Sequence, residues 1–78
     1  MKFTVKTLGD SIYEFTQKDG RIFFENKKIS GEVVRFRSGP ITVGKRISME
    51  FRNKNTPCTP KYVTVLNTAL VTKISVIQ

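Results

Sequence analysis

The stretch Ile47-Ser48-Met49-Glu50-Phe51-Arg52 alternates apolar and polar residues. Because successive side chains of a β-strand point to opposite faces, the apolar residues share one face and the polar residues share the other. The same period of two recurs, in shorter form, at Phe3/Val5, Tyr13/Phe15 and Val34/Phe36. The pattern predicts strands that bury one face and leave the other in solvent.

Turn-forming residues separate these runs. The Lys18-Asp19-Gly20 sequence suits a tight hairpin turn, and further breaks are expected at residues 9–11, 26–28 and 38–40. Residues 61–66 and 69–77 are rich in β-branched side chains and predict two more strands. No stretch combines helical periodicity with a capping residue, so we expect essentially no helix.

About six or seven short strands in one small chain predict a single all-β domain over residues 1–78, built as a small antiparallel barrel. An SH3-like barrel fits best. The alternative is an OB-like barrel, which normally carries a helix between its third and fourth strands. In either case, the core of the barrel is expected to contain Phe3, Phe15, Phe24, Phe36 and Phe51.

The cysteine content indicates a reducing compartment. Cys58 is the only cysteine, and it lies in the polar stretch 53–60, which is expected to be one exposed loop. No apolar run approaches the roughly 18 residues of a membrane span, and the N-terminal residues lack the apolar segment of a signal peptide. We therefore expect a cytoplasmic protein without membrane association.

The positive charge is unevenly distributed. Residues 1–26 contain four bases and four acids, whereas residues 27–78 contain ten bases and two acids, which gives the whole net charge of +8. A small domain with this distribution creates a field that attracts polyanions or an acidic protein surface.

The bases gather between residues 35 and 61, at Arg35, Arg37, Lys45, Arg46, Arg52, Lys54 and Lys61. If the apolar residues of 34–36 face the core, Arg35 and Arg37 project from the opposite face. By the same reasoning, Arg46 and Arg52 share the outer face of their strand. Residues two apart on a strand face are separated by about 6.6 Å, which suits a row of phosphates. The alternative is a solvated face without a ligand, but we favour a binding face because only six acids balance fourteen bases.

Residues 39–46 (GPITVGKR) match the G-x-x-x-x-G-K spacing of a phosphate-binding P-loop. A P-loop continues with Ser or Thr and then a helix, whereas here Arg46 follows and residues 45–52 alternate as a strand. We therefore expect no P-loop, and Gly44 is better explained as a bend or bulge.

Catalytic residues are also not expected. The chain has no histidine, the commonest general base and metal ligand. Turns explain Asp10 and Asp19, and Glu14 and Glu25 are expected to point outward and pair with lysines. No nucleophile–base pair can be proposed and no metal or cofactor is implied, so we expect a non-enzymatic protein.

Aromatic side chains can stack on nucleobases. The adjacent Phe23 and Phe24 cannot both point inward, so one of them is a candidate surface platform, as are Tyr13 and Tyr62. A packing role is the simpler interpretation for each.

Three segments, TLGDSIYE (7–14), ITVG (41–44) and NTALVTKI (67–74), carry a resemblance. They resemble a loose group of small, uncharacterised β-barrel proteins of bacteriophages and other mobile elements. The resemblance implies a barrel of phage or mobile-element origin, acting in the host cytoplasm. It supplies no active site and no ligand.

Two functions follow from the charge. The first is a binding module that holds nucleic acid, DNA or RNA, with little sequence specificity through residues 35–61. If six phosphate contacts form on duplex DNA, log K falls with log salt at a slope of about −5. The second is a phage-type inhibitor or adaptor that docks the same face on an acidic surface of a host protein. A homodimer through an edge strand is compatible with both.

Overall fold

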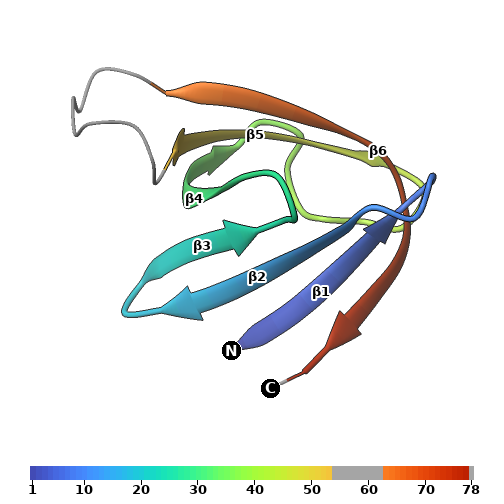
Figure 1. The fold of residues 1–78 in the computed structure, drawn as a ribbon, viewed down its shortest axis with the longest axis horizontal. Coiled ribbons are helices and arrows are strands. Elements are labelled where there is room, and N and C mark those ends of the chain that lie inside the picture. Colours follow the sequence, from blue (N-terminus) through green and yellow to red (C-terminus); the bar gives the residue numbers. More distant parts are fainter. Residues whose placement is uncertain (54–62, 78) are drawn as a thin grey trace.

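The computed structural model describes residues 1–53 and 63–77, which form a six-stranded closed barrel. The strands are β1 (Lys2–Thr7), β2 (Ile12–Lys18), β3 (Arg21–Glu25), β4 (Ser30–Phe36), β5 (Arg46–Asn53) and β6 (Thr64–Val76). Each strand pairs antiparallel with the next, and β6 curves around the barrel to pair with β1 (Figure 1). The prediction of a small antiparallel barrel is confirmed, and the described residues contain no helix.

The strand order is a meander, which differs from the Greek-key order of an OB-fold. Because the barrel is closed, every described strand has a neighbour on both sides. Dimerisation through a strand edge would therefore require the barrel to open. The described part of the chain contains no helix of the length and apolarity that a membrane crossing needs.

The core is filled mainly by aromatic and β-branched side chains. Its buried members are Val5, Phe15, Phe24, Val33, Ile47, Met49, Phe51 and Val71. The Phe15 ring lies 5.2 Å from that of Phe3 and 6.1 Å from that of Phe36, measured between centroids. The Phe24 and Phe51 rings meet edge to face at 4.9 Å. All five phenylalanines expected in the core therefore line it.

The predicted turns join the strands at the expected positions. Asp19 and Gly20 both have positive φ, 53° and 75°, as a type I′ hairpin turn requires. Gly9 and Asp10 also have positive φ, 94° and 66°, between β1 and β2. The turn between β3 and β4 begins at Asn26, whose Oδ1 accepts a hydrogen bond from the backbone N–H two residues later.

The predicted inward position of Val34 is wrong. Val33 is in the core and only 9% exposed, whereas Val34 is 46% exposed. The pairing with β5 shifts register between Val33 and Arg35, so Val34 is the extra residue of a β-bulge. The bulge resets the alternation, and as a result Arg35 still points outward while Phe36 packs against the core.

The two strands predicted at 61–66 and 69–77 are a single 13-residue strand, β6, in the described residues. The register between β5 and β6 shifts beside Ile47, whose N–H donates to the hydroxyl of Thr68 at 3.0 Å. That hydroxyl in turn donates to the carbonyl of Ala69 at 2.7 Å. The strand continues through this irregularity because a side chain replaces the missing backbone partner. The predicted loop, including Cys58, lies outside the described residues beyond Asn53.

Candidate anion-binding surface

Arg35 is on the outer face of β4, as predicted, but its charge is already matched. Its Nε and Nη2 donate to the same carboxylate oxygen of Glu50 on β5, at 2.9 and 2.6 Å. The two residues are direct cross-strand partners. The Glu50 side chain is only 22% exposed, so the pair is partly shielded from water. Arg35 therefore offers little free charge to a ligand.

Arg52 forms no ion pair within the described residues, but a carboxylate is its cross-strand neighbour. It lies directly opposite Glu32, which belongs to β4. The same carboxylate is 3.8 Å from the Nε of Arg21 on β3. Positive and negative side chains thus alternate across the outer face of β3, β4 and β5 at this end, and the predicted basic face is interrupted here.

Three cations remain at the other end of the β4–β5 pair. The backbone N–H of Arg37 donates to Ser48 at 2.7 Å, which places Arg37 opposite that residue. Arg46 precedes Ser48 by two positions on the outer face of β5, so Arg37 and Arg46 are diagonal neighbours with Cβ atoms roughly 7–8 Å apart. Lys45 adjoins them. All three are exposed, and none forms an ion pair within the described residues. We call Arg37, Lys45 and Arg46 the cationic cluster.

The backbone before β5 holds this cluster in place. Gly44 has a φ of 89°, a conformation that L side chains rarely adopt. Its N–H donates to the Val71 carbonyl at 2.8 Å, and the Val71 N–H donates to the Lys45 carbonyl at 2.9 Å. These bonds tie the start of β5 to β6. A strand follows Gly44 where a P-loop needs a helix, which explains the glycine as a bend.

Five of the seven predicted basic residues lie in the described part of the chain, and they fall into two groups. Arg35 is paired with Glu50, Arg52 lies opposite Glu32, and the other three form the cationic cluster. Lys54 and Lys61 lie outside the described residues. The sequence carried a signal for this division. Residues 27–78 contain only Glu32 and Glu50 as acids, and Glu50 is at an outward position of a predicted strand, where cross-strand pairing with arginine is favourable.

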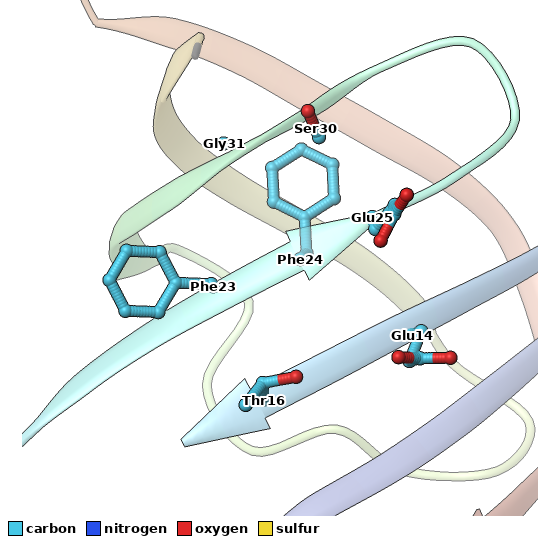
Figure 2. A pocket seen from close by; sticks show the side chains of 7 residues that line it. All are labelled: Glu14, Thr16, Phe23, Phe24, Glu25, Ser30 and Gly31. Atoms are coloured by element: carbon cyan, nitrogen blue, oxygen red, sulfur yellow. The ribbon is translucent and has the colours of Figure 1, made fainter. Parts of the chain in front are cut away.

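The outer face of β2 and β3 has the opposite character. Glu14 and Glu25 are direct cross-strand partners and line a hollow of about 170 Å³ (Figure 2). Glu14 pairs with Lys2 at 3.2 Å, as predicted, but no lysine of the described residues pairs with Glu25. Phe23 lines the same hollow and is 38% exposed, whereas Phe24 is buried. The carboxylates repel a polyanion, so Phe23 is poorly placed to stack on nucleobases.

No protein-family model, curated protein or solved structure matches the chain. Among the predicted basic residues that the structure describes, Arg37, Lys45 and Arg46 are the ones without a carboxylate directly opposite on the neighbouring strand.

Proposed function

We propose that this protein is a non-enzymatic module that binds the phosphodiester backbone of nucleic acid through the cationic cluster. The observation that carries the proposal is the free charge of Arg37, Lys45 and Arg46. Arginine and lysine without carboxylate partners release counterions from phosphates when they bind, which supplies most of the affinity of sequence-independent complexes.

The arrangement of the cluster supports low sequence specificity. The cations project from the outer face and end of a rigid sheet, and no recognition helix is present among the described residues to enter a groove. Contacts to phosphates fix the position of a nucleic acid but carry no sequence information. The net charge of +8 adds a long-range attraction that speeds association.

The test compares two triple variants of equal net charge. R37S/K45S/R46S removes the cationic cluster, and K2S/K6S/K18S removes three lysines of β1 and β2, so each lowers the net charge from +8 to +5. Fluorescence anisotropy with labelled duplex and single-stranded DNA at about 50 mM salt should show that the first variant loses at least tenfold in affinity. The control should lose less than about threefold. Equal losses would show that only total charge matters, and the proposal would fail.

A second function, docking on an acidic protein surface, is favoured by apolar side chains beside the cluster. Leu70 is the cross-strand partner of Arg46, and the Leu8 N–H donates to the Leu70 carbonyl at 2.8 Å. Leu8, Leu70 and Val43 are 64%, 38% and 56% exposed. An apolar centre with charged neighbours is typical of protein interfaces. A stoichiometric protein partner that is lost in L70S, with no binding of DNA or RNA, would select this function.

A further inference from the structure

A second hollow lies where the β1–β2 turn and the start of β2 meet the β3–β4 turn. It occupies about 460 Å³, within the usual range of about 300–1,000 Å³ for small-ligand sites. Its apolar lining comes from Ile12, Tyr13, Ile29 and Leu66. The turn between β3 and β4 adds Lys27 and Lys28 to its rim. The hollow thus joins an apolar lining that includes one aromatic ring to two adjacent cations.

Hydrogen bonds of Asn26 hold one wall of this hollow. The Nδ2 of Asn26 donates to the Ile12 carbonyl at 3.0 Å and so ties the β3–β4 turn to β2. Its Oδ1 accepts from the Lys28 N–H at 3.1 Å, and its own N–H donates to the Ile29 carbonyl at 2.8 Å. A wall held in this way costs little ordering when a ligand binds.

The charge of the hollow favours an anion. Lys27 and Lys28 are exposed and form no ion pair within the described residues. Asp10 is the acid that lines the hollow, and Lys6 pairs with it at 3.3 Å. The matching ligand has a flat apolar part for the lining and a negative group for the two lysines.

We infer that this hollow takes one unstacked nucleobase, with the phosphate of the same nucleotide at Lys27 and Lys28. Tyr13 provides the stacking surface, and the aliphatic side chains cover the rest of the base. The inference rests on the proposed function, in which the ligand is a nucleic acid. It adds a preference for single strands, because a paired base cannot enter the hollow. The β1–β2 turn connects the hollow to the cluster through the Leu8–Leu70 hydrogen bond.

The first experiment compares oligothymidylate with an abasic strand of equal length, which has the same phosphates but no bases. Oligothymidylate should bind about tenfold more tightly, the effect of one stacked base. The 55%-exposed Ile12 allows a variant that spares the core, and I12D should abolish the preference. V34D makes the same change at a 46%-exposed position outside the hollow and should retain it. Equal affinities for the two strands in the wild type would overturn the inference.

The second experiment measures the fluorescence emission of Tyr13. The chain has two tyrosines and no tryptophan, so in Y62F the emission belongs to Tyr13. Thymidine 5′-monophosphate should quench this emission in Y62F and leave it unchanged in I12D/Y62F. If duplex DNA binds but neither base preference nor quenching is seen, the hollow is not a base site while the proposed function stands. If the mononucleotide quenches but no polymer binds, the hollow stands and the proposed function fails.

Discussion

Glu50→Gln should strengthen nucleic-acid binding, because it releases an arginine. In the native barrel both Arg35 donors end on one Glu50 oxygen, at 2.9 and 2.6 Å. The glutamine side chain is neutral, so the guanidinium becomes available to a phosphate. Arg35 lies two residues from Arg37, and a fourth free cation therefore joins the cationic cluster.

The magnitude follows from counterion release. One added phosphate contact makes the slope of log K against log salt steeper by about 0.9 on duplex DNA. Between about 50 and 200 mM salt, the affinity of E50Q for duplex DNA should therefore fall by an additional factor of about 3.5 compared with wild type. At the lower salt concentration, E50Q should bind about three- to tenfold more tightly than wild type. The lost ion pair destabilises the fold by at most about 1 kcal/mol, since the Arg35 side chain is 68% exposed.

Fluorescence anisotropy over a salt series measures both quantities, and E14Q is the matched control. It also raises the net charge from +8 to +9, but it frees Lys2 on the β1–β2 side of the barrel. E14Q should change affinity by less than about twofold. A gain in E14Q equal to that in E50Q would refute the location of the binding surface, and no gain in E50Q would refute phosphate contact beside β4.

Two further predictions concern the fold. In G31A the new Cβ would collide with the carbonyl oxygen of Arg52, so the free energy of unfolding should fall by about 1–3 kcal/mol. The fall should be smaller in G39A, where no atom lies within 4 Å of the new Cβ and only the strain of a φ of 80° is added. Thermal melts followed by circular dichroism should show the larger drop for G31A, and equal midpoints would contradict the close approach. T68V should cost about 1–3 kcal/mol because it leaves the buried Ile47 N–H without its acceptor. Urea unfolding should show T68S, which keeps the hydroxyl, nearer to wild type than T68V.

The period of two and the turn residues were enough to predict the barrel, because each describes a local preference of the chain. The bulge at Val34 was not predictable in the same way. Val33 and Val34 are identical side chains, so the sequence does not show which of them faces inward. The pairing of β4 with β5 decides it, and that register is a property of two strands.

The binding surface was predictable in composition but not in detail. Counting charges located the basic segment, whereas the pairing of Arg35 with Glu50 depends on the β4–β5 register. The hollow beside Tyr13 was even harder to predict from the sequence. It forms where the start of β2 meets the β3–β4 turn and a residue of β6, Leu66, far along the chain. Such a site exists only after the barrel has closed.

The salt dependence of duplex DNA binding, compared between wild type and R37S/K45S/R46S, separates phosphate contact by the cationic cluster from general attraction. Loss of three contacts should make the slope of log K against log salt shallower by about 2.7, while K2S/K6S/K18S should keep the wild-type slope within about 0.5. If all three proteins share one slope, the cationic cluster does not hold phosphates.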